Sequence, residues 1–413
     1  MPKLRFPEFQ DAGAWKVQPL SEICNVNPSS TKLPESFFYI DLGSVVNGYL
    51  IAQKIIKKQD APSRAQRLLK TGDIIFQIVR PYQRNNFFCN FNKENHYVAS
   101  TGYAQLRAFE SSPFLYHAIH TNDFVNRVIS KCTGSNYPAI NSSDLANVKL
   151  SIPDANEQQK IADCLFSINE LITAEKKKLD VLKTYKKGLM QQLFPAEGET
   201  HPKLRFPEFQ TASEWTEKYF YDLLDEVLDF RGRTPTKLGM AWGGGNVLSL
   251  SANNVKNGYI DFNTQCNLGS DDLHEKWMGK VELQKNDIVF TMEAPLGNAL
   301  LLPDSQKYIL SQRVVAFKTK KNIANSFLIQ LIWSRNFQNK LSNLSTGSTA
   351  KGINQKALSK IKLRMPLMNE QQKIADCLSS IDELITAESK KLEVLKNHKK
   401  GLMQQLFPTM SEL

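Results

Sequence analysis

The chain has 413 residues, of which 41% are hydrophobic and 23% charged, so it holds enough apolar material for packed cores. At roughly 100 to 200 residues per domain, this length predicts two to four domains. There is no apolar leader of about 7 to 15 residues and no run of about 18 apolar residues, which predicts a cytoplasmic protein. The net charge of +11 favours a polyanionic partner, because clustered Lys and Arg displace counterions from phosphates.

Residues 1–153 predict a domain of mixed α and β structure. Residues 73–79 have the short apolar pattern of a β-strand, and residues 113–130 have the apolar spacing of a helix. Gly, Pro and Asn residues separate such segments, as they do at turns. We therefore expect an α+β domain in which short strands alternate with loops.

A long helix is predicted directly after this domain, and it occurs twice in the chain. Residues 156–195 recur almost unchanged as residues 369–408, and each copy follows a TGS motif. Packing against two divergent domains would not require one shared surface, so the near-identity predicts an identical partner met twice. The copies differ only at Phe166/Ser379, Asn169/Asp382, Lys176/Ser389, Asp180/Glu393, Thr184/Asn397 and Tyr185/His398.

Apolar residues in both copies recur at alternating steps of four and three, which is the pattern of a coiled-coil seam. Glu175 and Lys186 interrupt the first seam, and Glu388 and Lys399 interrupt the second at the same places. If the two helices run antiparallel, Glu175 is expected to face Lys399, and Lys186 to face Glu388. The predicted seam residues are Ile161, Leu165, Ile168, Ile172, Leu179, Leu182, Ile374, Leu378, Ile381, Ile385, Leu392 and Leu395.

The repeated helices have an expected length and an expected weak point. A continuous helix over residues 157–193 would be roughly 55 Å long at about 1.5 Å per residue. Gly188 and Gly401 each cost about 1 kcal/mol relative to alanine within a helix. We therefore expect a bent or separate last turn at each glycine.

The second half of the chain repeats the plan of the first. Residues 195–201 form a short polar connector, and the string PKLRFPEFQ that begins at Pro2 begins again at Pro202. A tryptophan follows each string, at Trp15 and at Trp215. The second variable domain has predicted strands and a predicted helix at residues 288–292, 313–318 and 326–341.

Motifs for catalysis are not found in the sequence. Asn27 and Pro28 are followed by serines and not by the Pro-aromatic pair of an amino-methyltransferase, and no GxxxxGK[ST] motif occurs for ATP. The glycine run that begins at Gly243 lacks the spacing of a dinucleotide fingerprint. A loose nuclease pattern joins Asp154 to Glu175, but Glu175 lies on the seam and the second half has leucine at the equivalent of Asp154. We expect no enzymatic activity from this chain.

No metal site or bound cofactor is expected either. His117 and His120 have no acidic or cysteine partner nearby in the sequence, so they are predicted to be surface or core residues. The cysteines occur singly and without a CxxC pair, which predicts reduced core thiols. They are Cys24, Cys89, Cys132, Cys164, Cys266 and Cys377.

Taken together, these motifs resemble the specificity subunits of type I restriction-modification systems along essentially the whole chain. The resemblance rests on the duplicated NEQQKIA start and GLMQQLF end of the repeated helices, and on the TGS and IN motifs before each. The string PKLRFPEF with its tryptophan is similar to the family's usual domain entrance. The RGRTP string at Arg231 and the NGYI string at Asn257 also look like the family, whereas the first domain has Asn27-Pro28-Ser29 in place of a GxTP element.

The resemblance implies an α+β fold with internal pseudo-twofold duplication, in which two long helices form an antiparallel coiled coil between two target-recognition domains. These domains would read the halves of an asymmetric, bipartite DNA site, and the helices would hold them about one duplex turn, roughly 34 to 36 Å, apart. Two methyltransferase subunits and restriction subunits would be the partners, and S-adenosylmethionine, ATP and Mg²⁺ would bind to them. The expected segments are residues 1–153 (first recognition domain), 154–195 (first helix), 196–201 (linker), 202–366 (second recognition domain), 367–408 (second helix) and 409–413 (tail).

Candidate DNA contacts are side chains that can recognise base edges. Arg and Lys donate to guanine, and Asn and Gln pair with adenine, so loops rich in these residues are the first places to look. Some of them will contact phosphates only. The candidates are Arg80, Tyr82, Gln83, Arg84, Asn85, Asn86, Ser135, Asn136 and Tyr137 in the first domain, and Arg231, Arg233, Thr234, Asn253, Asn254, Ser348 and Lys351 in the second.

Two other functions remain open on the sequence. The chain could be a structural adaptor whose coiled coil tethers other proteins, which salt-dependent binding to duplex DNA would distinguish. It could also be a single-chain modification enzyme, which methyl transfer by the purified chain alone would reveal.

Overall fold

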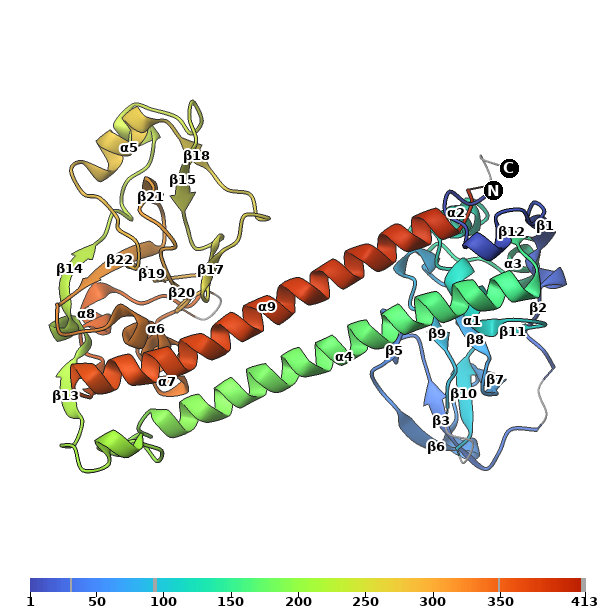
Figure 1. The fold of residues 1–413 in the computed structure, drawn as a ribbon, viewed down its shortest axis with the longest axis horizontal. Helices are drawn as coiled ribbons and strands as arrows, with labels where there is room; N and C mark the ends of the chain where they lie inside the picture. Colours follow the sequence, from blue (N-terminus) through green and yellow to red (C-terminus); the bar gives the residue numbers. More distant parts are fainter. Residues whose placement is uncertain (30–31, 92–94, 348–349, 410–413) are drawn as a thin grey trace. The chain divides into compact units, whose positions relative to one another are not determined.

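The computed structural model of the chain describes residues 1–29, 32–91, 95–347 and 350–409 (Figure 1). It contains two compact units. The first unit comprises Met1–Lys177 and Lys390–Leu413, and the second comprises Lys178–Ser389. Each unit therefore takes segments of long helix from both halves of the chain, and the units do not follow the linear order of the expected domains.

The variable part of the first unit contains two four-stranded sheets. One has the strand order β2-β11-β8-β9, and the other has the order β6-β3-β10-β7. A separate two-stranded sheet, β1 (Lys16–Pro19) with β12 (Lys149–Ile152), closes the domain next to the long helix. The other strands are β2 (Cys24–Val26), β3 (Ser36–Ile40), β4 (Val45–Val46), β5 (Tyr49–Leu50), β6 (Lys54–Lys57), β7 (Ala65–Leu69), β8 (Ile74–Gln77), β9 (Phe87–Phe88), β10 (Tyr97–Ser100) and β11 (Tyr103–Ala108).

The predicted helix at residues 113–130 is two helices in the structure. These are α1 (Ser112–Ala118) and α2 (Asn122–Ser130), and α3 (Ser142–Ala146) follows later. Thr121 interrupts the helical pattern because its side chain accepts the Phe124 backbone N–H and caps the start of α2. Phe114 and Phe124 are fully buried beneath the sheet, so the apolar spacing survives the break.

The second unit repeats this plan. A four-stranded sheet has the order β14-β22-β19-β20, a three-stranded sheet has the order β18-β15-β21, and β13 pairs with β23. The predicted helix at residues 326–341 is again divided, because Ser334 caps a second helix. The elements are β13 (Thr216–Tyr219), β14 (Leu224–Leu228), β15 (Val247–Leu250), β16 (Val255–Lys256), β17 (Tyr259–Ile260), β18 (Leu268–Gly269), α5 (Asp271–Met278), β19 (Ile288–Thr291), β20 (Ala299–Leu301), β21 (Tyr308–Leu310), β22 (Val314–Thr319), α6 (Asn325–Trp333), α7 (Arg335–Leu344), α8 (Gln355–Leu358) and β23 (Lys362–Met365).

The long helices α4 (Ala155–Leu193) and α9 (Met368–Leu406) contribute one part to each unit. In the first unit, Ile161 of α4 shares a core cluster with Leu406 of α9. In the second unit, Leu193 of α4 shares a core cluster with Ile374 of α9. The start of one helix thus lies beside the end of the other in each unit, so the paired segments are antiparallel, as predicted.

Burial supports the predicted seam. Leu182, Ile385 and Leu395 are half-buried, and the other nine residues are buried: Ile161, Leu165, Ile168, Ile172, Leu179, Ile374, Leu378, Ile381 and Leu392. The helices continue through Gly188 and Gly401, so the last turn is not a separate element at either glycine, which excludes one of the two alternatives that we expected, a bent or a separate last turn. Burial of the leucine and phenylalanine that follow each glycine outweighs its helix cost of about 1 kcal/mol.

The charged residues of the seam have a different register from the expected one. Glu175 binds Lys391 in the first unit, and Glu388 binds Lys178 in the second. Lys186 binds Asp382 at 2.7 Å. The expected pairing of Glu175 with Lys399 and of Lys186 with Glu388 is therefore wrong. The reason is that the helix ends are fixed by burial in the domain cores, and this sets which charges lie opposite one another.

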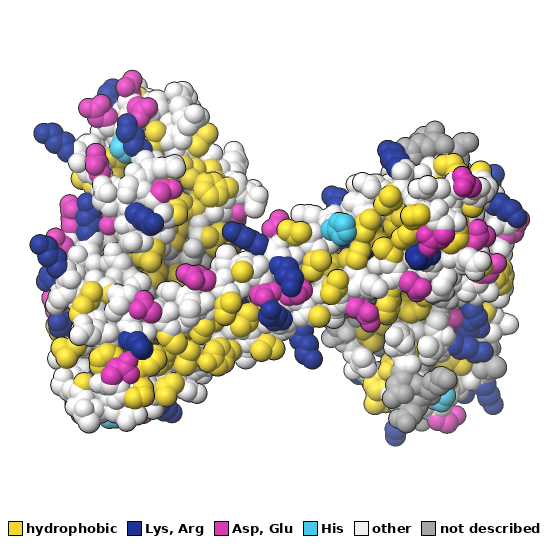
Figure 2. Space-filling view, viewed as in Figure 1, with side chains coloured by type: hydrophobic (Ala, Val, Ile, Leu, Met, Phe, Trp, Pro, Cys, Tyr) yellow, Lys and Arg dark blue, Asp and Glu magenta, His cyan; other side chains and the backbone are white. Residues whose placement is uncertain are grey.

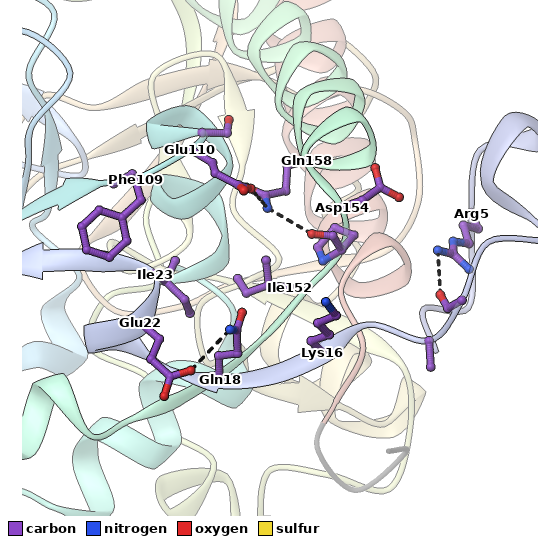
Figure 3. Close-up of a pocket in the computed structure, with 15 residues that line it drawn as sticks. Arg5, Lys16, Gln18, Glu22, Ile23, Phe109, Glu110, Ile152, Asp154 and Gln158 are labelled. Carbon is purple, nitrogen blue, oxygen red and sulfur yellow. Dashed lines mark hydrogen bonds between the residues drawn. The ribbon is translucent and has the colours of Figure 1, made fainter.

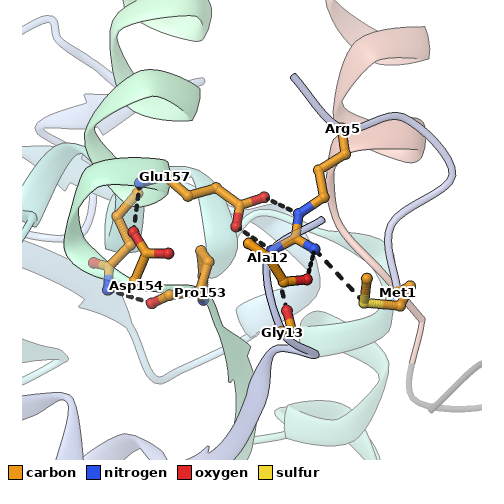
Figure 4. Close-up of polar contacts among 8 residues, drawn as sticks. Met1, Arg5, Ala12, Gly13, Pro153, Asp154 and Glu157 are labelled. Atoms are coloured by element: carbon orange, nitrogen blue, oxygen red, sulfur yellow. Dashed lines mark hydrogen bonds and ion pairs between the residues drawn. The ribbon is translucent and has the colours of Figure 1, made fainter. Parts of the chain in front are cut away.

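The repeated string PKLRFPEF ties each domain to both long helices. In the first unit, Arg5 Nε and Nη2 donate to the Glu157 carboxylate at 2.8 and 2.6 Å, and Nη1 donates to the Ala12 carbonyl at 2.6 Å (Figure 4). The Leu4 N–H donates to the carbonyl of Gln405, at the end of α9, at 3.0 Å. A single short segment thus joins the start of α4 to the end of α9.

The second unit contains the same clamp. Arg205 Nε and Nη2 each donate to the Glu370 carboxylate at 2.7 Å, and the Leu204 N–H donates to the Gln192 carbonyl at 3.0 Å. Trp215 Nε1 adds a hydrogen bond of 3.3 Å to Glu370. Glu370 is buried, and hydrogen bonding to it raises the pKa of Arg205.

Candidate nucleic-acid interface

Two of the predicted contact segments in the first domain lie side by side. The loop after β8 contains Arg80, and the TGS loop begins at Thr133 and ends at Ala139, which forms a β-bridge with Val79. The Arg80 N–H donates to the Pro138 carbonyl at 2.7 Å, and the Ile140 N–H donates to the Ile78 carbonyl at 3.0 Å. The backbone therefore brings together residues that are more than fifty positions apart in the sequence.

Arg80 and Tyr137 form the contact between these loops. The Arg80 guanidinium lies 4.2 Å from the centroid of the Tyr137 ring, and Tyr137 is 66% exposed. Arg80 has a φ of 54°, in the left-handed region that side chains other than glycine rarely adopt. Its Nε is buried without a hydrogen-bond acceptor among the described residues. Ser135 and Asn136 beside Tyr137 are exposed, so this part of the predicted site is presented to solvent.

Other predicted residues of the first domain hold the loop itself. Arg84 donates to the His120 carbonyl at 3.1 Å and to Asn122 Oδ1 at 2.7 Å, so its side chain fastens the loop to the helices behind it. Asn85 accepts the Asn47 N–H at 3.1 Å. Gln83 accepts a hydrogen bond from Gln77 at 2.9 Å, although it is exposed, and Tyr82 is also exposed.

Asn86 lies inside the first domain and not on its surface. Its side chain is fully buried, its Oδ1 accepts the Gln77 N–H at 2.8 Å, and its Nδ2 lies 3.3 Å from His120 Nε2. An amide that is engaged in this way cannot reach a base. Asn86 therefore stabilises the loop, and the prediction of a direct DNA contact at this residue is wrong.

The second domain has the same arrangement of loops with different side chains. Glu293 bridges to Gly352, and the Ile353 N–H donates to the Met292 carbonyl at 2.9 Å. Ala294, followed by Pro295, has a φ of 41° at the position that Arg80, followed by Pro81, has in the first domain. Lys351 is exposed and donates from Nζ to Ser342 Oγ at 3.0 Å. Ser348, the remaining candidate in this loop, lies outside the described residues.

The RGRTP segment of the second domain is only partly joined to these loops. Arg231 donates to the Asp229 carboxylate at 2.6 to 3.0 Å, and Gln355, just after the TGS loop, donates to the same carboxylate at 2.7 Å. Arg233 instead lies over the Phe230 ring and donates to the Trp277 carbonyl. The Thr234 hydroxyl accepts the Lys237 N–H at 3.3 Å and so stabilises a turn.

The two asparagines after β15 have separate roles. Asn253 is exposed and stays a candidate contact. Asn254 is fully buried, where its Nδ2 donates to the Ser249 carbonyl and its Oδ1 accepts the Ser251 N–H, both at 2.8 Å. The prediction of a base contact at Asn254 is therefore wrong, because its amide closes the turn that it occupies.

Sequence reasoning missed two charged residues at the loop pair of the second domain. Glu293 Oε1 lies 3.8 Å from Arg313 Nε, and both side chains are about half exposed. The Met292 N–H donates to the Arg313 carbonyl at 2.7 Å, which places Arg313 beside the loop. Alignment of the Arg80-Pro81 and Ala294-Pro295 dipeptides would have found Glu293, because Glu293 directly precedes Ala294.

A pocket of about 430 Å³ lies at the base of the first domain, beside the start of α4 (Figure 3). Gln158 extends into it and donates to the Glu110 carboxylate at 2.8 Å and to the Pro153 carbonyl at 3.0 Å. Its lining also includes Phe109 and Asp154 but none of the predicted DNA contacts. We assign the pocket to the junction between domain and helix.

The described part of the chain offers few features for other kinds of chemistry. Within it, no group of three or more His, Cys, Asp or Glu side chains is arranged to hold a metal ion. None of its helices combines the length and the apolar character needed to cross a bilayer. All six cysteines are free thiols, but only Cys24 and Cys89 are buried, so the expectation of six core thiols holds for those two. On the face drawn in Figure 2, basic and acidic side chains are interspersed over each unit.

The fold and the paired loops define a duplicated α+β protein in which each unit presents two loops from an antiparallel helical base. The family "Type I restriction modification DNA specificity domain" matches residues 13–184 and 214–397, so the chain belongs to this family. Both matches include a complete loop pair and most of a long helix.

Individual relatives agree with this assignment. The type I restriction enzyme MjaVIII specificity subunit of Methanocaldococcus jannaschii is 31% identical over 285 residues, which are 67% of this chain and 65% of that relative. The putative MjaX specificity subunit of the same organism is 26% identical over 284 residues, or 66% of this chain and 61% of that relative. Each match thus spans somewhat less than two thirds of the relative's own length.

Solved structures share the fold. The crystal structure of a type I restriction-modification S subunit from M. genitalium has a TM-score of 0.59 at 14% identity, covering 99% of this chain and 100% of that one. A chain from a structure that describes assembly and conformational transition of the type I R-M system has a TM-score of 0.56 at 19% identity, covering 98% and 99%.

Proposed function

We propose that this chain is the non-catalytic DNA-reading subunit of a type I restriction-modification complex. It recognises an asymmetric, bipartite site and directs methyltransferase and restriction subunits to it. One observation carries the proposal: the same backbone brings the same two loops together in both units, while the exposed side chains differ. The first loop pair presents Arg80 and Tyr137, and the second presents Glu293 and Lys351. A common scaffold with unlike contact residues suits two different half-sites.

The partner surface in this proposal is the repeated helix. Leu171 and Leu384, at equivalent positions of α4 and α9, are each 53% exposed, and Val181 and Val394 are exposed in the same way. Exposed aliphatic side chains repeated at equivalent places favour one kind of protein partner, met once on each copy. We assign this partner as the methyltransferase subunit, and S-adenosylmethionine, ATP and Mg²⁺ as ligands of the partner subunits.

Mapping methylated adenines in the source genome, before and after deletion of this gene, tests the proposal. We expect one bipartite motif to disappear on deletion and to return when the gene is restored. Persistence of every motif would contradict it.

The purified chain should also bind duplex DNA with an affinity that falls steeply as salt rises, which a protein-tethering adaptor would not do. Methyl transfer by the chain alone would instead indicate an enzyme.

Arg80→Ala is expected to weaken specific DNA binding by about 1 to 3 kcal/mol, because the guanidinium over Tyr137 would no longer reach a base or phosphate. Alanine is suited to the test, since Ala294 has the same left-handed backbone region in the second domain. Titration of the assembled complex with a duplex that contains its site gives the affinity. Unchanged affinity and unchanged selectivity for the first half-site would exclude this role, and an unchanged melting temperature would show that the fold is intact.

A further inference from the structure

The Glu293–Arg313 pair is an unusual feature for a surface that meets DNA. An exposed carboxylate repels phosphates, so it lowers affinity unless it makes a favourable contact of its own. The Glu293 side chain lies beside Gly352 and Arg313: its Cγ is 3.1 Å from the point where a Cβ on Gly352 would stand, and its Oε1 is 3.8 Å from Arg313 Nε. The carboxylate is thus positioned between two loops and is about half exposed.

The first domain shows that the fold does not require this pair. The bridge of Glu293 to Gly352 corresponds to the bridge of Val79 to Ala139, where both side chains are apolar. Gly352 leaves the space that the Glu293 side chain uses, whereas Ala139 faces a shorter valine. The same backbone contact is therefore made without charge in one domain and with charge in the other.

The surroundings of Glu293 carry further donors and acceptors. Arg231 is paired with Asp229, and this hydrogen bond raises the pKa of Arg231, with a smaller contribution from the negative charge of Glu293. Arg313 has a φ of 70°, so its backbone, like that of Arg80, is in the left-handed region. The pair thus lies in a charge-balanced group and costs less repulsion than an isolated carboxylate would.

We propose that Glu293 and Arg313 together read one G·C base pair in the half-site of the second domain. A carboxylate accepts a hydrogen bond from the N4 amino group of cytosine, and an arginine donates to O6 and N7 of guanine. In the free protein the two side chains neutralise each other, and on DNA each exchanges its partner for a base. This inference rests on the proposed function, because it assigns a base pair to the site that the function requires.

The inference is tested with two variants, Glu293→Gln and Arg313→Gln. Each replaces the wild-type chain in cells that contain the natural partner subunits, and the methylation pattern of the genome is then determined. We expect each variant to lose discrimination at the same single G·C position of the second half-site, by roughly 5- to 100-fold in relative binding of matched and mismatched duplexes. The first half-site should be read as before. Glu217→Gln is the matched control, since Glu217 forms a similarly exposed ion pair with Lys362 in the β13–β23 sheet.

The outcomes separate the inference from the proposed function. A wild-type motif without a G·C pair in the second half-site, or Glu293→Gln and Arg313→Gln variants that keep full discrimination, would overturn the inference alone. Loss of discrimination at two different base pairs would also overturn it, because the residues would then not act as one pair. If no motif depends on the chain, the proposed function fails and the inference fails with it. Melting temperatures of the variants show whether a lost motif reflects lost folding, and Arg313→Gln then provides an independent second test.

Discussion

Replacing Arg205 with alanine is expected to destabilise the second unit by about 3 to 5 kcal/mol, because it leaves the buried Glu370 carboxylate without its cationic partner. Arg205 also donates to the Ala212 and Ser213 carbonyls, so the substitution removes hydrogen bonds to the segment after the PKLRFPEF string as well as the ion pair to α9. Trp215 Nε1 would remain as a weak donor to Glu370. Thermal unfolding of the full chain, followed by calorimetry, measures the effect.

A neighbouring ion pair provides the control for this experiment. Lys373, also on α9, binds Glu208 at 3.2 Å, and both side chains are about half exposed. Lys373→Ala is expected to leave the unfolding temperature close to that of the wild type, because exposed ion pairs contribute little. If Arg205→Ala and Lys373→Ala behaved alike, the clamp would not be the strong contact that its burial and geometry indicate.

Acidification is expected to destabilise the first unit at a pH well above the pH at which the carboxylates of the ion pairs become protonated. Burial, with a smaller contribution from the charge of Lys399, lowers the pKa of His117 to about 3 and the pKa of His120 to about 4. Both histidines titrate near 6.5 when unfolded, so the unfolded chain binds more protons and stability falls as pH drops from 6.5 towards 4. At pH 5 the loss amounts to about 2 kcal/mol for each histidine.

The second unit supplies the substitution that tests this prediction. In that unit, Gln330, Trp333 and Asp382 occupy the positions of His117, His120 and Asn169. Gln330 donates a hydrogen bond of 2.8 Å to Asp382, and Lys186 lies over the Trp333 ring. His117→Gln should therefore remove about half of the decrease in the free energy of unfolding that occurs between pH 7 and pH 5. His398→Gln, at an exposed position of α9, should not change it. If the free energy of unfolding of His117→Gln fell between pH 7 and pH 5 as much as that of the wild type, His117 would not be a source of the acid sensitivity.

The repeated helices were predictable because their signal is periodic and occurs twice. The seam from Ile161 to Leu179 and its copy follow from apolar spacing alone. The register between them was not predictable, because it depends on how deeply Leu406 and Leu193 are inserted in the domain cores. A one-dimensional pattern contains no information about that depth, and so Glu175 was paired with the wrong lysine.

The candidate interface was predictable as segments but not residue by residue. The composition of the loops indicated Arg80 and Tyr137, and the structure brings them together. Composition cannot distinguish an asparagine that points outwards from one that closes its own turn, which is the difference between Asn253 and Asn254. Glu293 was missed because a search for basic and amide side chains does not consider carboxylates.

The placement of Leu406 and Phe407 has a consequence for synthesis on the ribosome. Both residues are buried in the core of the first unit, where Phe407 packs edge-on against Trp15 at 6.2 Å. They are translated after the entire second unit, so the core of the first unit cannot close until Lys178–Ser389 has been made. Domains usually fold in the order of their emergence, and this protein must instead keep its first domain incomplete while the second is made.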